Sequence, residues 1–282
     1  MKAWINNRLI EESEATVSMF DRSYLYGEGV FETLRCYDDK PAFLDRHYQR
    51  LSKNCKRLEI EMPLSEKQFS EAIHALTSAN QIKEAVVRIT VSTVGASFGV
   101  GRPKNPQTGA TLFCRPIELD QKLFETGVKV LPLQSLINDS PEIAGIKSTS
   151  YLTKMLARAE ASKAGAYESL LKNSKGHWVE GSRTNFFIVL DRVVITPPLS
   201  DGILNGITRE VVLEIAAEKK IPHREEHVTD LMLQNAEEIF LTGSTSEVMP
   251  VREVIGLCRK EIPKDGLAKK LLVAYRKRCP IF

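Results

Sequence analysis

Several features that mark secreted, membrane or nucleic-acid-binding proteins are missing from this sequence. Its cysteines are odd in number, widely scattered and without a CxxC pair, which argues against a disulfide framework or a zinc site. They favour a reducing, intracellular compartment. These cysteines are Cys36, Cys55, Cys114, Cys258 and Cys279. No apolar run approaches the roughly 18 residues that a membrane span needs.

The amino terminus and the charge balance exclude further classes. Residues Met1–Ala15 carry too much charge for a secretory signal peptide, so we expect a cytoplasmic protein. The net charge is only +3 and no basic stretch interleaves with aromatic residues, so we expect neither nucleic acid nor a membrane as a partner. With 43% hydrophobic and 27% charged residues, the composition is typical of a globular protein. No internal repeat or low-complexity segment is evident.

The length of 282 residues and the order of the patterns predict two domains. We place a small N-terminal domain at 1–117, an interdomain linker at 118–125 and a larger domain at 126–282. Strand and helix patterns alternate irregularly and include a hairpin at Asp191-Arg192, which favours the α+β class over a doubly wound sheet. Strands are expected at 85–93, 111–115, 128–131, 169–171, 186–190, 193–196 and 239–241, and helices at 45–58, 65–78, 149–164, 208–219 and 264–276.

Lys147 has surroundings that suit a lysine in covalent chemistry. It follows the apolar stretch 143–146 and precedes Ser148–Ser150, after which a helical pattern begins at Tyr151. This order predicts an ammonium at a buried strand-to-helix corner, facing a helix N-terminus, where desolvation and the helix dipole lower its pKa. A neutral amine is what Schiff-base formation with an aldehyde cofactor requires. The alternative is an interfacial lysine whose stem packs while its head reaches water.

Glu180 ends a short expected strand just before Gly181, which permits close approach of the backbone. A carboxylate at this point would hold a ring nitrogen protonated, which pyridoxal phosphate needs in order to act as an electron sink. The alternative is an ordinary acid at the end of a strand.

Two segments have the composition of anion-binding sites. Gly206-Ile207-Thr208 directly precedes a helical pattern, so backbone N–H groups and a hydroxyl converge at a helix N-terminus. Gly243-Ser244-Thr245-Ser246 follows an expected strand and combines glycine with hydroxyls, which suits a phosphate or carboxylate. Ordinary helix capping by Thr208 and a turn at Ser244 are the alternatives.

Six short segments carry the most specific pattern in the sequence. They are Asp21–Thr33, Leu44–Leu51, Ile146–Ser148, Val179–Phe187, Gly202–Arg209 and Thr242–Glu247. In order and spacing they resemble the signature motifs of the class IV aminotransferases, which are pyridoxal phosphate enzymes of fold type IV. That family includes branched-chain aminotransferases, D-amino acid aminotransferases and aminodeoxychorismate lyases. The resemblance extends from about Trp4 to about Val251, nearly the whole chain.

The resemblance implies a fold of two domains, a small N-terminal α/β sandwich-like domain and a larger C-terminal pseudo-barrel domain. It implies pyridoxal 5'-phosphate as the cofactor, with Lys147 as the lysine that carries the internal aldimine and shuttles the proton. Glu180 would pair with the pyridinium nitrogen, and Leu204 would pack flat against the ring. The phosphate would be held by Arg50, Ile207, Thr208, Ser244 and Thr245. No metal ion is implied.

The branches of the resembled family differ in the residues that hold the substrate. D-amino acid aminotransferases place an arginine and a histidine in the loop that corresponds to 95–103, where this chain has Gly99 and Gly101. Branched-chain enzymes have a tyrosine two residues before an arginine, and this chain keeps only the arginine, Arg88. Thr33 stands where those enzymes have glycine, and the pattern Phe31-x-Thr33 also occurs in the lyases.

From this resemblance we predict an enzyme that transfers the amino group of a branched-chain or other hydrophobic amino acid to 2-oxoglutarate. Aminodeoxychorismate lyase and D-amino acid aminotransferase are the alternatives. The expected substrate-binding residues are Phe31, Thr33, Arg88, Tyr151 and Gly243, together with the 95–103 loop. Tyr151 is equally well interpreted as a core residue of its helix, and Arg88 as a structural ion-pair residue. The resemblance also implies at least a homodimer, with a site between the domains that a partner subunit completes.

Overall fold

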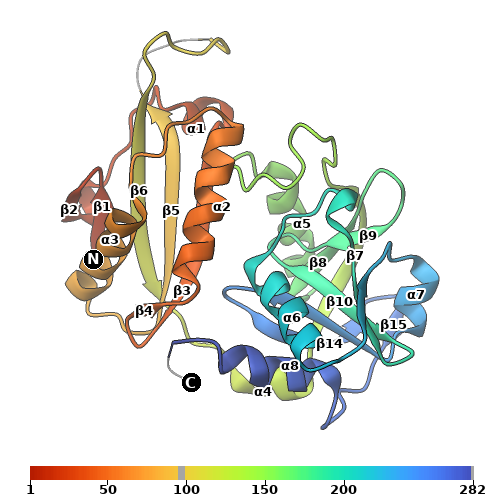
Figure 1. The fold of residues 1–282 in the computed structure, drawn as a ribbon. Coiled ribbons are helices and arrows are strands. Elements are labelled where there is room, and N and C mark those ends of the chain that lie inside the picture. The colour runs from red at the N-terminus through yellow and green to blue at the C-terminus, as the bar shows by residue number, and fades with distance from the viewer. Residues whose placement is uncertain (95–98, 281–282) are drawn as a thin grey trace. The chain divides into compact units, whose positions relative to one another are not determined.

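The computed structural model describes residues 1–94 and 99–280. The chain forms two compact units (Figure 1). Unit 1 contains residues 1–118, the short segment Ile146–Tyr151, and Cys279 with Pro280. Unit 2 contains Leu119–Gly145 and Leu152–Arg278. The domain bounds 1–117, 118–125 and 126–282 remain a prediction. Within 118–125, Asp120 accepts a hydrogen bond from the backbone of Lys122 and caps α4 (Gln121–Thr126).

Unit 1 is built on a six-stranded sheet with the strand order β2-β1-β6-β5-β3-β4. The central strands β3, β5 and β6 pair antiparallel over nearly their full lengths. In the described residues of this unit, three helices accompany the sheet. The elements are β1 (Lys2–Ile5), β2 (Arg8–Glu11), α1 (Arg22–Tyr26), β3 (Gly29–Tyr37), β4 (Lys40–Pro41), α2 (Leu44–Arg57), α3 (Glu66–Asn80), β5 (Ala85–Val94) and β6 (Gln107–Pro116), with a 3-10 turn at Glu12–Glu14.

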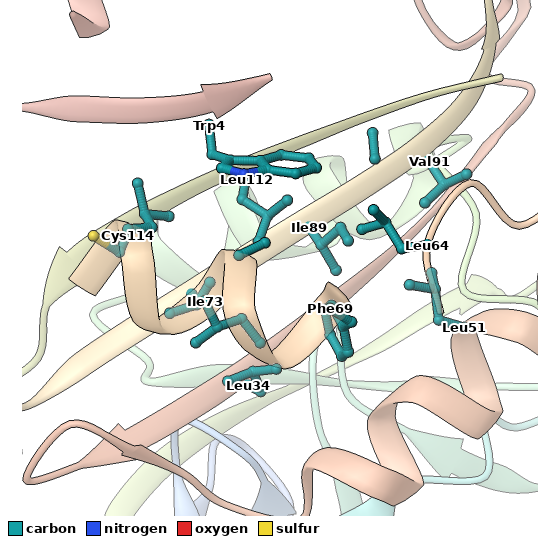
Figure 2. Close-up of a cluster of buried hydrophobic side chains, with 14 of the residues drawn as sticks. Trp4, Leu34, Leu51, Leu64, Phe69, Ile73, Ile89, Val91, Leu112 and Cys114 are labelled. Carbon is teal, nitrogen blue, oxygen red and sulfur yellow. The ribbon is translucent and has the colours of Figure 1, made fainter. Parts of the chain in front are cut away.

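The core of unit 1 lies between one face of this sheet and helices α2 and α3 (Figure 2). Alternate residues of β3, β5 and β6 point to this face because the side-chain repeat of a strand is two. Leu51 of α2 and Phe69 and Ile73 of α3 cover them and are fully buried. Each such side chain stabilises the fold by roughly 1.5–3 kcal/mol. Helix α3 begins with a capping box between Ser65 and Gln68.

The segment Ile146–Tyr151 lies against the free edge of β3. The backbone N–H of Phe31 donates to the carbonyl of Lys147 at 2.9 Å, and that of Thr149 donates to Gly29 at 2.8 Å. An isolated antiparallel bridge joins Val30 to Ser148 between these two bonds. The Thr149 hydroxyl adds a bond to the carbonyl of Gly27. A segment more than 100 residues away in sequence thereby becomes part of unit 1.

Unit 2 is a barrel. Six of its strands follow the order β10-β13-β14-β7-β8-β9, and β9 pairs with β10 so that the ring closes. Strands β11 and β12 extend the sheet beyond β10, and β15 pairs with β14. The strands are β7 (Val128–Leu136), β8 (Glu168–Lys172), β9 (Trp178–Glu180), β10 (Asn185–Leu190), β11 (Val193–Thr196), β12 (His223–Glu225), β13 (Glu238–Gly243), β14 (Glu247–Val254) and β15 (Cys258–Arg259).

The helices of unit 2 after α4 are α5 (Leu152–Lys163), α6 (Ile207–Glu218), α7 (Asp230–Asn235) and α8 (Leu267–Arg276), with a 3-10 turn η2 at Leu199–Asp201. Glu238 accepts hydrogen bonds from the backbones of Leu267 and Ala268, which satisfies the first turn of α8. The α+β class and the pseudo-barrel of the larger unit are thus confirmed.

Two local expectations were wrong. Lys147 does not follow a strand, because residues 141–145 form turns and Ile143 is 44% exposed. The helix expected at 149–164 begins only at Leu152, since residues 148–149 pair with β3 instead. The other expected helices and strands exist, with bounds that differ by a few residues. In the described part of the chain, none of the helices combines the length and apolar character needed to cross a membrane.

Candidate active site

Lys147 is held in unit 1 beside the aromatic ring of Phe31. Its carbonyl accepts the N–H of Phe31, and its Nζ lies 4.5 Å from the centre of the Phe31 ring. The side chain is half-buried. Because hydrogen bonds to the edge of β3 fix the main chain of Lys147, its amine lies at one end of that strand.

The predicted substrate-binding residues of unit 1 gather around Phe31. Residue pairing between β3 and β5 puts Thr33 opposite Arg88 and Phe31 opposite Thr90, so Phe31, Thr33 and Arg88 share one face of the sheet. The Arg88 guanidinium lies 3.6 Å from the centre of the Phe31 ring. The Tyr151 ring meets that of Phe31 edge-on, with the ring centres 5.5 Å apart. Tyr151 is half-buried and lies just before α5, which begins at Leu152, so it is not a core residue of a helix.

Arg88 is a partly buried cation whose side chain forms no ion pair with a carboxylate in the described residues. Burial lowers the pKa of its guanidinium, partly offset by the nearby Tyr151 hydroxyl. The cation–π contact with Phe31 compensates for part of the lost hydration. Of the two interpretations, a structural ion pair therefore has no support in the geometry. An Arg88 that meets the carboxylate of a small molecule is consistent with it.

Arg50, expected to hold the cofactor phosphate, is bound to Glu32 in unit 1. Its Nε and Nη2 atoms lie 2.7 and 2.8 Å from the two carboxylate oxygens of Glu32, a two-point contact that fixes the guanidinium. His47 Nδ1 lies 2.8 Å from Glu32 Oε2. Glu32 alternates with Val30 and Leu34 along β3 and so points toward α2, which carries both His47 and Arg50.

The charges of this triad follow from its burial. Burial raises the pKa of Glu32, but the charge of Arg50 and the hydrogen bonds from Arg50 and His47 lower it by more, so it lies well below its usual range. Burial lowers the pKa of His47, as do the charges of Arg50 and Lys147, against the opposing effect of Glu32. At pH 7 we infer a charged Glu32–Arg50 pair and a neutral His47. The contribution of Glu32 to stability is present above the ordinary glutamate pKa and is lost as the pH falls through the lowered value.

Glu180 lies at the end of β9 in unit 2 and is 4% exposed. Its Oε1 atom accepts from Lys154 Nζ at 2.7 Å, and its Oε2 atom accepts from the backbone N–H of Leu204 at 3.1 Å. The next residue is Gly181, and a Cβ at this position would lie only 2.5 Å from the Thr184 hydroxyl oxygen. The carboxylate is therefore fixed in direction by a helix residue and by a loop, rather than exposed in a turn.

Asn185 joins the loop of Leu204 to the barrel. It is paired with Glu180 across β9 and β10, and its Nδ2 atom donates to the carbonyl of Leu204 at 2.9 Å. A Cβ at position 206 would lie 2.0 Å from Asn185 Oδ1, so only glycine fits there. The Leu204 backbone is thus held on both sides, by Glu180 and by Asn185. Its side chain is half-exposed.

The first predicted anion-binding segment, Gly206-Ile207-Thr208, lies at a helix N-terminus as expected. Gly206 is the N-cap of α6, without a side-chain cap, and Ile207 and Thr208 are its first two helical residues. Their N–H groups belong to the set that a helix leaves without internal partners. The Thr208 hydroxyl lies 3.5 Å from that of Tyr275. Capping by Thr208, the alternative, is not observed, because Thr208 lies inside the helix.

The second predicted anion-binding segment is the turn between β13 and β14. Gly243, Ser244 and Thr245 are half-exposed, and the N–H of Ser246 donates to the carbonyl of Gly243 at 3.0 Å. Strand β13 pairs with β10 so that Thr242 lies opposite Asn185. Asn185, which holds the loop before α6, therefore also lies beside β13, the strand that leads into this turn. Both predicted anion-binding segments belong to unit 2 and are connected through β10.

Unit 1 thus brings Lys147 together with Phe31, Arg88 and Tyr151, while Glu180 and Leu204 are in direct contact in unit 2. Other predicted residues lie within these frameworks: Thr33 and Arg50 in unit 1, and Ile207, Thr208, Gly243, Ser244 and Thr245 in unit 2. The sequence did not single out Glu32, His47, Lys154 or Asn185. Of the predicted specificity loop, residues 95–98 lie outside the described residues, and the carbonyls of Gly99, Val100 and Gly101 accept hydrogen bonds from Arg22.

Comparisons with known proteins show the family of this chain. Residues 29–254 match the family described as amino-transferase class IV. The chain belongs to the class IV aminotransferases. Two similar proteins illustrate the spread of the family. A Methanocaldococcus jannaschii protein with the provisional name branched-chain-amino-acid aminotransferase is 34% identical, with 98% of this chain and 96% of the relative covered. The D-alanine aminotransferase of Bacillus licheniformis is 32% identical over 91% of this chain and 89% of the relative.

Solved structures of class IV aminotransferases share the fold. The branched-chain aminotransferase of Thermoproteus uzoniensis with norvaline has a TM-score of 0.89 at 31% identity and covers 98% of this chain and 94% of its own. The 4-amino-4-deoxychorismate lyase of Pseudomonas aeruginosa has a TM-score of 0.86 at 29% identity, with 98% of both chains covered. The T.th. branched-chain amino acid aminotransferase with pyridoxamine 5'-phosphate has a TM-score of 0.87 at 26% identity, with 98% and 93% covered.

Proposed function

We propose that this enzyme transfers the amino group of a hydrophobic, branched-chain-type amino acid to 2-oxoglutarate. The observation that carries the proposal is the cluster in unit 1. There, Arg88, which has no carboxylate partner among the described residues, lies with the aromatic rings of Phe31 and Tyr151 and the amine of Lys147 around one strand end. A cation suits the carboxylate of an amino or oxo acid, and the aromatic rings suit an apolar side chain. The chain's likeness to a Thermoproteus uzoniensis branched-chain aminotransferase with norvaline supports this choice.

We propose pyridoxal 5'-phosphate as the cofactor, and the residues of unit 2 fit its phosphate. The glycine-capped N-terminus of α6 offers backbone N–H groups and the Thr208 hydroxyl, and the space at Gly206 admits no Cβ. The turn at Gly243–Thr245 offers further donors from its amides and hydroxyls. The solved relative with pyridoxamine 5'-phosphate supports this assignment. Arg50, whose guanidinium is held by Glu32, is proposed as a further ligand of the phosphate.

The cofactor, when bound, supplies an electron sink for the bond that breaks at the substrate Cα. Lys147 would then remove the proton from Cα and return it, with Nζ as the base, while its fixed main chain limits where the proton goes. Glu180 would accept a hydrogen bond from the ring nitrogen and keep that nitrogen protonated. Lys154 and the N–H of Leu204 orient the carboxylate for this task. Leu204 would cover the ring.

The second candidate function is that of an aminodeoxychorismate lyase. Thr33 favours it, because this hydroxyl faces the same side of the sheet as Phe31 and Arg88 and adds a polar group to an otherwise apolar wall. The lyase from Pseudomonas aeruginosa also matches 98% of this chain. D-amino acid transamination comes third, because Gly99 and Gly101 present only backbone carbonyls, both bound to Arg22.

A substrate panel tests this assignment. The holoenzyme is assayed with L- and D-amino acids and 2-oxoglutarate, and separately with aminodeoxychorismate. We expect the highest kcat/KM for L-leucine, L-isoleucine or L-valine. In Arg88→Ala, kcat/KM should fall by about 10- to 150-fold for every substrate carboxylate tested, the range for a lost charged hydrogen bond. Arg8→Ala, an exposed arginine of the same sheet, serves as the control. Faster turnover of aminodeoxychorismate would contradict the assignment in favour of the lyase.

We further propose that the enzyme is a homodimer. Leu152 lies three and four residues before Met155 and Leu156 on α5, and these residues are 72%, 61% and 58% exposed. An apolar patch of this kind on a helix indicates a protein contact. Sedimentation of the enzyme should give twice the 31.7 kDa of one chain. Leu156→Glu should shift the equilibrium to monomer, whereas Lys163→Glu at the exposed end of the helix should not. A monomeric parent enzyme with full activity would contradict the proposal.

A further inference from the structure

A cluster of His177, Asp201 and His227 lies in unit 2 and has no part in the proposed reaction. His177 directly precedes β9, Asp201 ends the 3-10 turn η2, and His227 follows β12. An antiparallel bridge between Trp178 and Val228 joins the two segments that carry the histidines, and each histidine is the residue before a bridge partner. Their rings stack with centres 4.6 Å apart.

Asp201 is the centre of the cluster and is almost fully buried, with 1% of its surface exposed. Its Oδ2 atom lies 2.8 Å from His227 Nδ1. Its Oδ1 atom has no hydrogen-bond partner in the described structure, and His177 Nδ1, 3.8 Å away, has none either. Two buried atoms that can each present a lone pair thus face each other without a donor between them. A buried carboxylate oxygen left in this state costs free energy.

A cation between these atoms would remove that cost. From this geometry we propose that His177, Asp201 and His227 form a binding site for a divalent first-row transition metal ion, with zinc as its representative. Two imidazoles and one carboxylate are a donor set that such ions prefer over calcium or magnesium. The fourth position of a tetrahedral ion would be taken by water, as in zinc sites with three protein ligands.

The spacing of the ligand atoms suits this ion. One donor atom from each of the three residues lies within 4.8 Å of the other two. Bonds of about 2.1 Å in tetrahedral geometry place ligand atoms about 3.4 Å apart, so the site needs only small side-chain movements. His227 is half-exposed and can turn, whereas Asp201 is rigidly buried. The carboxylate therefore acts as the fixed ligand and the histidine side chains adjust to the ion.

The position of the site gives it a role in unit 2. His177 lies three residues before Glu180, and Asp201 lies three residues before Leu204, whose N–H is bound to Glu180. A bound ion would join the start of β9 to η2 and would brace the two segments that hold the Glu180–Leu204 contact. We therefore expect zinc to stabilise the folded enzyme while leaving its reaction chemistry unchanged.

Titration of the holoenzyme with zinc chloride tests the proposal. Calorimetry in a buffer without phosphate or amino acids should show one zinc ion per chain. Zinc at about 100 times its Kd should raise the Tm of the holoenzyme by about 5 °C or more. His227→Ala should weaken binding at least tenfold and abolish the shift in Tm. His223→Ala, an exposed histidine on β12 outside the cluster, should bind zinc as the parent does.

Asp201→Asn provides a second and more severe change, since it removes the charged ligand but keeps the size of the side chain. Because a buried substitution can prevent folding, the His227→Ala result stands by itself. The proposal is overturned if the holoenzyme binds no zinc. It is also overturned if His227→Ala binds zinc like the parent, because the ion then sits elsewhere, on thiols or on the surface. Activity on amino acids is not used as the readout, so failure of the proposed transamination would not affect the outcome.

Discussion

Lys147→Ala should lower the rate of transamination by at least about 10³-fold, because in the proposed reaction this one side chain would supply both the covalent contact with the cofactor and the base that moves the Cα proton. The fold should be retained. The contacts that attach residues 146–151 to β3 run through the main chain, and the N–H of Phe31 still meets the carbonyl of residue 147. The rate is measured in a coupled assay that detects glutamate, and the fold by circular dichroism and Tm.

A matched lysine separates this role from a general effect of charge. Lys163 is exposed at the end of α5, so Lys163→Ala should keep parental rates. If Lys147→Ala retained more than about a tenth of the parental rate, Lys147 would be an interfacial lysine whose ammonium packs over Phe31 and nothing more. A lowered Tm together with a loss of activity would indicate a structural role for Lys147 instead.

Glu180→Gln should lower the rate by about 10²-fold, the scale for removing one positioned electrostatic partner. Glutamine keeps the shape of the side chain and can still accept the N–H of Leu204, but it has no charge to keep a ring nitrogen protonated. Its amide also faces the Lys154 ammonium, which loses its ion-pair partner. The affinity for the cofactor, measured by equilibrium dialysis, should change much less than kcat.

Glu160→Gln is the control for this prediction, since Glu160 is an exposed acid on α5, the helix that carries Lys154. A glutamine variant at position 180 with parental kcat would reduce Glu180 to an acid that merely anchors the Leu204 loop. Equal losses in cofactor affinity and in kcat would show that the carboxylate acts by positioning that loop.

Much of the fold was accessible from local patterns. The helix over 45–58 was expected and lies at Leu44–Arg57, because its apolar residues recur at helical spacing and cover the sheet. The hairpin around Asp191-Arg192 was also expected, and both residues adopt positive φ angles as a tight turn requires. The turns before Lys147 were not expected, because an apolar run of four residues does not distinguish a strand from a partly exposed turn.

The candidate site divides in the same way. The helix N-terminus at Gly206-Ile207-Thr208 was expected from the order of glycine, hydroxyl and helix pattern, which is a property of adjacent residues. The contacts of Glu32 with His47 and Arg50 were not expected, because they depend on which face of β3 meets α2. Lys154 was hidden for a similar reason, since its partner Glu180 lies 26 residues away.

The sequence by itself determined the family and the α+β class. It also supplied the lysine and the acid that we propose for the reaction, because all of these follow from motifs whose members are adjacent along the chain. The tertiary structure alone decided which groups meet. Strand pairing set Phe31 beside Lys147, and closure of the barrel through β9 and β10 set Asn185 beside Glu180. It also assembled His177, Asp201 and His227 from three separate segments. The physical reason is that pairing register and burial act between distant residues, which a local pattern does not encode.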